Sequence, residues 1–238
     1  MSKHELLKKL IPTPVRRALK RVKNVLIDEF AYTSYSQEGE DMILNRIFEG
    51  RRDGFYVDVG AHHPRRFSNT YFFYKRGWTG INIEPNPDAI RTFYSQRSRD
   101  KNIQCGISDC EGVRKYYHFD DSALNTFDEE IVKSRMKHSN YRLVKHEYIP
   151  LVRLDDVLKK NLDRGVRIDF LTVDAEGFDL AVLKSNDWSL FRPSFILTEV
   201  LDASFEEAVN GEVAEFMRGQ QYKIFAKTFN TLIFCEAE

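Results

Sequence analysis

Short runs of apolar and β-branched residues alternate with helical periodicity from residue 55 onward. The pattern predicts strands at 55–59, 78–84, 102–107, 113–119, 147–152, 168–173 and 194–200. It predicts helices at 69–76, 86–97, 154–161, 178–186 and 204–218. Strands that alternate with helices in this way are typical of a mostly parallel sheet covered on both faces.

Local signals mark several boundaries of these elements. Asn86-Pro87-Asp88 suits a helix start, and Ser204 with Glu207 forms a capping box. The final strands, 222–228 and 231–236, are separated by so few residues that they must form an antiparallel hairpin. The polar segment 120–146 is expected to be the most irregular part of the chain, and loops of that length are usually functional or mobile.

Composition limits the class of protein. The chain has 238 residues, equal numbers of basic and acidic residues, and a net charge of zero. The protein as a whole therefore has no positive electrostatic field that would attract nucleic acid. Its three cysteines form no C-x-x-C motif, which favours a reducing compartment over a disulfide framework or a zinc site. We therefore expect a cytoplasmic protein. If it binds a polyanion, we expect a local group of basic residues, and not the net charge, to bind it.

The first 34 residues differ from the rest of the chain. They contain neither a signal peptide nor a membrane span, but Val15, Leu19, Val22 and Leu26 fall on one face of a helix whose other face is basic. We expect residues 1–34 to form an amphipathic extension and residues 35–238 to form the main domain. The helix packs against protein, or residues 1–30 contact an anionic membrane surface at the inner face of the membrane.

Acidic residues gather at the predicted carboxyl ends of the strands, where open α/β sheets bind their ligands. Glu84 lies 24 positions after Gly60, the spacing at which a carboxylate reaches the ribose hydroxyls of an adenosine cofactor. The first loop has only one glycine, so it lacks the glycine-rich backbone that binds a pyrophosphate. The negative charge of Asp58 just before this loop would also repel a pyrophosphate. This excludes NAD and favours S-adenosylmethionine, whose amino acid group and sulfonium are cationic.

Four ordered segments carry a resemblance to a known family. They are YSQEGEDMILNRIF at 35–48, FYVDVGAHHPRRFSNTYFFYKRGWTGINIEPNP at 55–87, GISDCEG at 106–112 and IDFLTVDAEGFDLAVL at 168–183. Together they resemble the FkbM-type S-adenosylmethionine-dependent methyltransferases over residues 35 to about 236. The resemblance implies a Rossmann-like class I methyltransferase fold, with a mostly parallel seven-stranded sheet and a C-terminal antiparallel hairpin.

The resemblance also implies roles for particular residues. Asp58, Gly60 and Ala61 would form the floor of the cofactor site, and Glu84 would bind the ribose. Ser108 and Asp109 would meet the adenine edge, and Asp174 would lie near the methionine end. Gln37 and Asp41 would belong to a motif that closes over the site. The segment 120–146 matches no motif of the family, which leaves the acceptor side open.

Methyl transfer to a hydroxyl is aided by a base, and the candidate catalytic residues are His62, Asp174 and Glu176. Adjacent histidines rarely face one metal ion, so His62 and His63 are expected to be structural or to lie on the acceptor side. Asp174 and Glu176 with Glu199 resemble a divalent-cation cluster. We nevertheless expect cofactor and acceptor contacts there, and no metal.

The sequence thus predicts an O-methyltransferase that uses S-adenosylmethionine. Members of the family it resembles mostly methylate hydroxyls of sugars or natural products, and the resemblance to those that act on glycans is closest. The expected acceptor is a hydroxyl of a sugar, polysaccharide or lipo-oligosaccharide. The alternatives are an RNA 2′-O-methyltransferase, which the neutral charge disfavours, and a cofactor-binding module without turnover.

Overall fold

The structure is a computed structural model that describes residues 12, 14–15, 31–138, 140–201 and 203–237. The chain divides into two units, Met1–Ser34 and Tyr35–Glu238. The basic helix predicted in the first unit falls mostly outside the described residues. Among those that are described, no helix is both long and apolar enough to cross a membrane.

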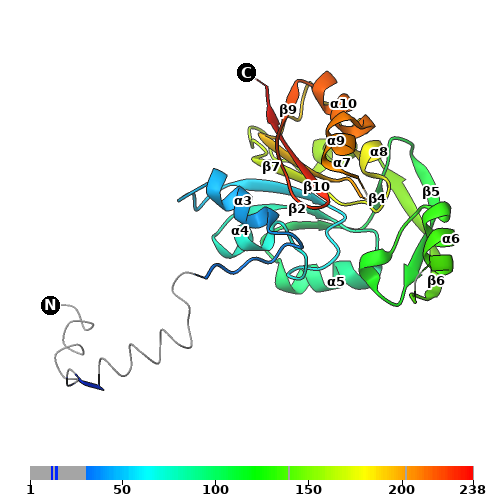
Figure 1. Cartoon of the computed structure of the whole chain (residues 1–238), viewed down its shortest axis with the longest axis horizontal. Coiled ribbons are helices and arrows are strands. Elements are labelled where there is room, and N and C mark those ends of the chain that lie inside the picture. Colours follow the sequence, from blue (N-terminus) through cyan, green and yellow to red (C-terminus); the bar gives the residue numbers. More distant parts are fainter. Residues whose placement is uncertain (1–11, 13, 16–30, 139, 202, 238) are drawn as a thin grey trace. The chain divides into compact units, whose positions relative to one another are not determined.

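A seven-stranded sheet forms the centre of the unit Tyr35–Glu238 (Figure 1). Its strands in spatial order are β3 (Lys101–Ile103), β2 (Thr79–Ile83), β1 (Phe55–Val59), β7 (Phe170–Val173), β8 (Phe195–Glu199), β10 (Thr231–Glu236) and β9 (Tyr222–Lys227). The first five are parallel, while β10 runs antiparallel to both of its neighbours. The predicted sheet and its terminal hairpin are confirmed.

Both faces of this sheet are covered, because successive residues of each strand point to opposite sides. On β1, Tyr56 packs into a cluster with the helices α3 (Glu40–Ile47) and α4 (Tyr71–Lys75). The next residue, Val57, belongs to the other cluster, with α7 (Leu154–Asn161), α8 (Asp179–Lys184) and α10 (Glu212–Gly219). Both side chains are fully buried. This packing fixes which strand ends lie next to one another at the carboxyl edge of the sheet.

A second, three-stranded sheet lies beside the first and is drawn in green in Figure 1, except for its shortest strand. It consists of β4 (Gly106–Ile107), β6 (Leu143–Val152) and β5 (Gly112–Phe119), in that order. The strand predicted at 102–107 is therefore wrong: the chain leaves the main sheet after Ile103 and enters the second sheet at Gly106. A Cβ at Gly106 would lie 2.5 Å from a side-chain carbon of Leu151 and 2.6 Å from the ring of Phe127, so the chain packs tightly where it enters the second sheet.

The segment 120–146 is more regular than the sequence predicts. It contains a 3₁₀ turn (Ser122–Leu124), the helix α6 (Glu129–His138) and the first residues of β6. Most side chains of β6 before Pro150 are exposed or only partly buried. The residues of β6 before 147 therefore carry no apolar alternation that a sequence pattern could reveal, whereas its second half is the strand predicted at 147–152.

Other boundaries follow the local signals, with one exception. In α5 (Pro87–Gln96) the side chain of Asn86 accepts a hydrogen bond from the backbone N–H of Asp88, as predicted. The capping box of Ser204 and Glu207 is also confirmed. The single helix predicted at 204–218 is wrong, because extended backbone at Gly211 divides it into α9 (Phe205–Asn210) and α10.

Candidate active site

The carboxyl ends of β1, β2, β7 and β8 open into one cavity of about 410 Å³, which we call the strand-end cavity. Its volume lies within the range of sites for small molecules and cofactors. Eight of the predicted cofactor-binding and catalytic residues line it: Gln37, Asp58, Gly60, Ala61, His62, Glu84, Asp174 and Glu176. The topology thus brings together groups up to 139 positions apart in the chain, from Gln37 to Glu176.

Gly60 makes the turn that opens the cavity at the end of β1. Its φ is +78°, and a Cβ there would lie 1.7 Å from the carbonyl oxygen of Asp174. The backbone of β7 therefore passes directly against this turn. The N–H groups of Gly60 and Ala61 both donate to the carbonyl of Ile83 at the end of β2, at 3.0 and 3.1 Å. Only glycine allows three strand ends to meet so closely.

Asp58 is buried just before this turn and faces the cavity. One of its carboxylate oxygens accepts a hydrogen bond of 2.7 Å from the hydroxyl of Thr70. Burial raises the pKa of Asp58 to about 6, although the bond from Thr70 and the charge of Arg97 oppose that shift. Asp58 is thus largely ionised near neutral pH and gives the floor of the cavity a negative charge.

Glu84 holds a carboxylate at the end of β2 with both oxygens in fixed positions. Its Oε2 accepts from the backbone N–H of His62 at 2.7 Å, and its Oε1 accepts from that of Asn86 at 2.8 Å. Each carboxylate oxygen can accept about two hydrogen bonds, so each retains one acceptor site. Burial raises the pKa of Glu84 to about 7.

The two histidines have different environments. His63 accepts hydrogen bonds of 3.0 Å at Nδ1 from the backbone N–H groups of Arg65 and Arg66, which is a structural role. His62 lines the cavity with a left-handed φ of +50°. Burial, followed by the charge of Arg66, lowers the pKa of His62 to about 4, so its imidazole is neutral and weakly basic at pH 7.

Three acids converge at the ends of β7 and β8. Asp174, Glu176 and Glu199 each place a carboxylate oxygen within 4.8 Å of the others. Asp174 is exposed to the cavity, and dense protein atoms nearby still limit its access to water. Burial and then repulsion from Glu199 raise the pKa of Asp174 well above its ordinary value. Burial and repulsion from Glu176 raise the pKa of Glu199 to about 8.

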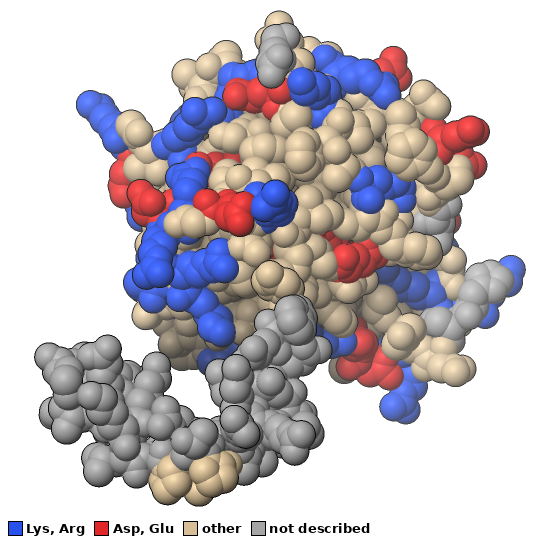
Figure 2. Space-filling model, turned by 60° about the vertical axis from the view of Figure 1, so that its left-hand side comes forward, with Lys and Arg blue, Asp and Glu red and all other residues tan. Residues whose placement is uncertain are grey.

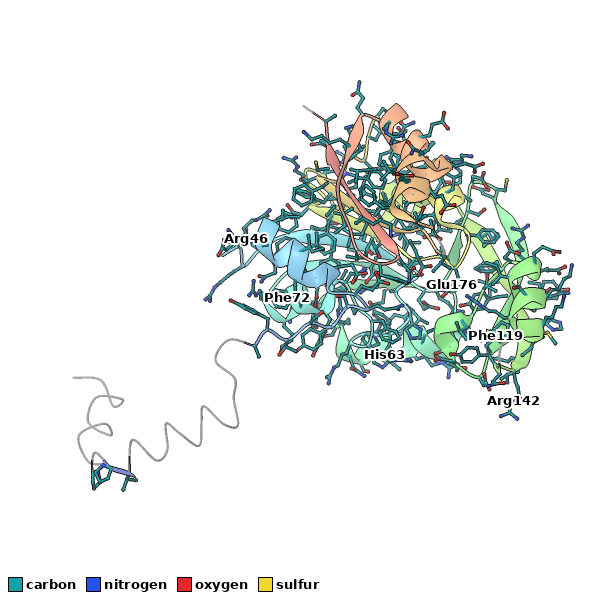
Figure 3. The ribbon with its side chains drawn as sticks, in the orientation of Figure 1. Arg46, His63, Phe72, Phe119, Arg142 and Glu176 are labelled. Atoms are coloured by element: carbon teal, nitrogen blue, oxygen red, sulfur yellow. The ribbon has the colours of Figure 1, made fainter. Side chains whose placement is uncertain are left out.

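Glu176 differs from the other two acids because it has a cationic partner. Arg135 of α6 forms an ion pair with it, while burial raises the pKa of Glu176 and Arg135 lowers it. Figure 3 shows Glu176 between the main sheet and the green lobe of β5, α6 and β6. The three oxygens are close enough to share a divalent cation, so the expectation of a site without metal stays a prediction.

Three predicted cofactor residues do not line the strand-end cavity. Ser108 and Asp109 lie instead in a separate hollow beside Gly112 and Phe178, because the chain has already crossed into the second sheet at that point. Cys105, Gly106 and Ile107 take their place on the cavity wall. Asp41 is buried in α3, where its carboxylate accepts from the backbone N–H of Tyr35 and the hydroxyl of Ser36. It shapes the loop that carries Gln37.

Several other residues of the wall had no predicted role. These are Phe67, Asn69, Arg135, Tyr141, Leu201 and the segment 121–127. That segment belongs to the polar stretch that matched no motif, and it lines the same cavity as Asp58 and Glu84, which makes it part of the site. Glu199 also lines the cavity, and the sequence had singled it out in the acidic cluster with Asp174 and Glu176.

This sheet order and C-terminal hairpin, with a single-glycine turn after β1 and an acid after β2, match the Rossmann-like class I methyltransferase fold. Residues 58–224 match the family model described as the Methyltransferase FkbM domain, which is well over half of the chain. The chain therefore belongs to the FkbM methyltransferases. S-adenosylmethionine is the methyl donor of this family, so the chain is an S-adenosylmethionine-dependent methyltransferase.

Several solved structures are similar at low identity. The C-terminal domain of precorrin-6Y C5,15-methyltransferase from Rhodobacter capsulatus has 10% identity and a TM-score of 0.43, with 89% of this chain and 96% of that chain covered. The 1,6-didemethyltoxoflavin-N1-methyltransferase from Burkholderia thailandensis, solved with S-adenosylhomocysteine, has 14% identity and a TM-score of 0.42, with coverage of 100% and 92%. No curated protein sequence matches the chain.

The residues of the strand-end cavity fit S-adenosylmethionine. Glu84 presents two free acceptor sites that suit the two ribose hydroxyls, and Asp58 offers a negative charge to the cationic amino acid group. The turn at Gly60 allows the ligand to approach the backbone, because no Cβ stands in the way. When bound, the cofactor supplies an electrophilic methyl group on a positively charged sulfur.

Proposed function

We propose that the protein transfers the methyl group to a hydroxyl oxygen of a sugar or glycan. The observation that carries this proposal is the pair formed by Asp174 and Glu199 in the wall of the cofactor cavity. Both groups have a raised pKa, and the repulsion between them means that they titrate as a pair. A carboxylate that titrates near neutral pH is well suited to act as a general base.

A hydroxyl needs such a base because it is a poor nucleophile while it keeps its proton. Asp174 and Glu199 would take up the proton of the acceptor hydroxyl as its oxygen attacks, and the bound cofactor would supply the methyl group and keep the electrons of the broken carbon–sulfur bond. A positioned base typically contributes roughly 10²–10⁴-fold to the rate, and alignment of the reacting atoms contributes the rest. His62, with its lowered pKa, is better suited to accept a hydrogen bond from the acceptor.

The polarity of the wall supports an acceptor with several hydroxyls. The amides of Gln37 and Asn69 line the same cavity as the acids, and both amides and carboxylates accept hydrogen bonds from hydroxyl groups. The NH₂ group of Asn69 donates to the hydroxyl of Thr172 at 2.9 Å, which holds this amide in place. Arg135 holds Glu176 in place beside them.

The RNA alternative receives no comparable support. The chain has no net charge, and the face in Figure 2 carries basic and acidic side chains that are mostly interspersed, with a basic group at one edge. Phosphate contacts by lysine and arginine supply most of the non-specific affinity for RNA. A contact of residues 1–30 with a membrane, where glycan precursors are often assembled, stays part of the proposal.

Product analysis tests the proposed function. The protein is incubated with radiolabelled S-adenosylmethionine and three separate pools of acceptors: bacterial polysaccharide, total RNA and simple phenols. We expect label in O-methyl monosaccharides after acid hydrolysis of the polysaccharide. Label in RNA, or in no pool although S-adenosylhomocysteine binds, would contradict the proposal. Asp174→Asn serves as the control and should lower the rate by about 10²-fold or more.

A further inference from the structure

Three exposed basic residues surround the helix α4 without an acidic partner. They are Arg65, Lys75 and Arg99, and none of them has an acid within ion-pair distance among the residues that the structure describes. Arg66, the next residue after Arg65, does have such a partner, because it pairs with Asp121 at 3.5 Å. We call Arg65, Lys75 and Arg99 the cation cluster. Their charges are not neutralised by the fold and are available to an anionic partner.

Aromatic rings of α4 hold the two arginines of the cation cluster in place. The guanidinium of Arg65 lies 5.5 Å from the centre of the Tyr71 ring, and that of Arg99 lies 3.8 Å from the centre of the Tyr74 ring. The two rings are stacked on each other, with 6.4 Å between their centres. Arg99 also donates to the backbone carbonyl of Tyr74. A guanidinium has five N–H donors, so both arginines keep most of theirs for the oxygens of a phosphate.

Lys75 belongs to the same surface. Its ammonium lies 5.1 Å from the centre of the Tyr35 ring and donates to the hydroxyl of Tyr35 at 2.7 Å. The Tyr35 ring in turn meets the ring of Tyr71 edge-on at 4.7 Å. The hydrogen bond to Tyr35 raises the pKa of Lys75, while the nearby charge of Arg65 opposes that shift. The three cations are thus neighbours, and side chains that are already ordered lose little entropy when a ligand binds.

The cation cluster lies next to the wall of the strand-end cavity. Arg66 and Phe67, which follow Arg65 directly, both line that cavity. Tyr35 is the first residue of the unit Tyr35–Glu238, so residues 1–34, whose sequence is also rich in basic residues, join the main unit at this surface. A partner that binds the cation cluster would therefore lie beside the catalytic site.

We infer that the cation cluster binds the phosphate groups of an anionic phospholipid membrane. The inference goes beyond the proposed function and beyond the expected contact of residues 1–30, because it assigns a surface of the folded domain. Headgroups present phosphates as a plane of negative charge that several separate cations contact together, and tyrosine suits the interface between water and lipid. Single-stranded RNA would need aromatic faces on which bases stack, whereas cations already lie over Tyr35, Tyr71 and Tyr74.

Co-sedimentation of the full chain with lipid vesicles tests this inference. One set of vesicles contains phosphatidylglycerol with phosphatidylcholine, and the other contains phosphatidylcholine alone. We expect binding to the anionic vesicles only, and its loss at high salt, which screens the attraction. The combined change Arg65→Gln, Lys75→Gln and Arg99→Gln should weaken this binding about 10- to 100-fold, since each cation near an anionic membrane contributes roughly fivefold.

Two further variants separate the position of the charges from their number and from the fold. The combined change Lys160→Gln, Arg164→Gln and Lys184→Gln removes three exposed cations that have no acidic partner in the described part of the chain. They lie on or next to α7 and α8, which cover the opposite face of the main sheet, and this variant should bind vesicles like the wild type. Arg65→Lys with Arg99→Lys keeps the charge and should retain most of the binding. All variants should bind S-adenosylhomocysteine equally, which shows that they fold.

The possible outcomes are distinct. Anionic vesicles that bind the variant without the cation cluster as well as the wild type, or an equal loss in both triple variants, would overturn the assignment of this surface. The membrane is the wrong partner if the wild type binds no vesicles, or if it binds an RNA oligonucleotide instead and the cluster variant does not. The proposed function is judged separately, because the product analysis uses acceptors without a membrane.

Discussion

At the scale of single residues, a buried chain of hydrogen bonds supports the cofactor site from behind. Arg97 is completely buried and donates to the phenol of Tyr56, the carboxylate of Asp100 and the hydroxyl of Thr70, at 2.8 to 2.9 Å. Thr70 then donates to Asp58. Asp58 therefore receives a hydrogen bond whose donor is itself fixed by a buried cation.

Removal of the Thr70 hydroxyl should weaken cofactor binding. Thr70→Val keeps the shape but leaves Asp58 without this bond, which favours its protonated, neutral form. We expect the Kd of S-adenosylhomocysteine to rise about tenfold at pH 7, since a hydrogen bond to a charged group contributes about 1.5–3 kcal/mol. Titration calorimetry measures this. Thr70→Ser should bind normally, and equal affinity in both variants would refute a role for the hydroxyl.

Glu84 gives a second test at this scale. Glu84→Gln replaces one acceptor oxygen by an NH₂ group, which would face a backbone N–H and could not accept from a ribose hydroxyl. We expect the affinity for S-adenosylhomocysteine to fall about 10- to 100-fold, because hydrogen bonds to a charged group are lost. A variant that binds as the wild type does would show that Glu84 positions the backbone at His62 and Asn86 but does not bind the ribose.

The sequence was sufficient to predict those site residues that lie at the end of one strand. Asp58, Gly60 and Glu84 each lie within one residue of the end of a central strand, which fixes them in the cavity. Ser108 and Asp109 do not line the strand-end cavity, because the strand predicted before them divides between two sheets. No local pattern of the sequence shows that division.

At the scale of elements, the site depends on how closely the ends of β1 and β7 approach. Gly60 is the contact point between them. The sequence predicted these strands because they are buried and rich in β-branched residues. It predicted the second half of β6, at 147–152, but not its first residues or α6, because these are mostly exposed. The part of the cavity wall that α6 contributes through Arg135 was therefore not predicted from the sequence.

Gly60→Ala should abolish cofactor binding and destabilise the fold by at least about 2 kcal/mol, since it adds a clash to left-handed strain. Gly165→Ala is the matched control, with a φ of +81° but nothing within 4 Å of the added Cβ. We expect that control to cost only about 1 kcal/mol and to bind normally. Urea unfolding and calorimetry compare the two. Equal losses would mean that strain, rather than the approach of β7, governs the turn.

At the scale of the whole molecule, the fold concentrates buried acids at one edge of its sheet. Burial raises the pKa of Glu84 and Asp179 to about 7 and that of Glu199 to about 8. Such an acid favours the folded state in its protonated form. Its contribution to stability is complete below the ordinary pKa near 4 and is lost as the pH rises through the folded-state value.

The ligand-free protein should therefore be less stable at about pH 8.5 than at about pH 6. Each unit of raised pKa corresponds to about 1.4 kcal/mol, so we expect the melting temperature to fall by at least about 2–4 °C between these pH values. Differential scanning calorimetry measures the change. Glu199→Gln removes one of the acids and should show a smaller fall. A protein that gains stability over this range would contradict the raised pKa values.

The most direct test of the proposed base is the pH dependence of methyl transfer to the carbohydrate found by product analysis. In the wild type, kcat/KM should rise with pH through a value near 8, as Glu199 loses its proton and the pair of Asp174 and Glu199 becomes ionised. Glu199→Gln removes the repulsion on Asp174, so its profile should move to lower pH while S-adenosylhomocysteine binding stays unchanged. A profile that is flat from pH 5 to 9, or one that Glu199→Gln leaves in place, would show that these carboxylates do not take the proton.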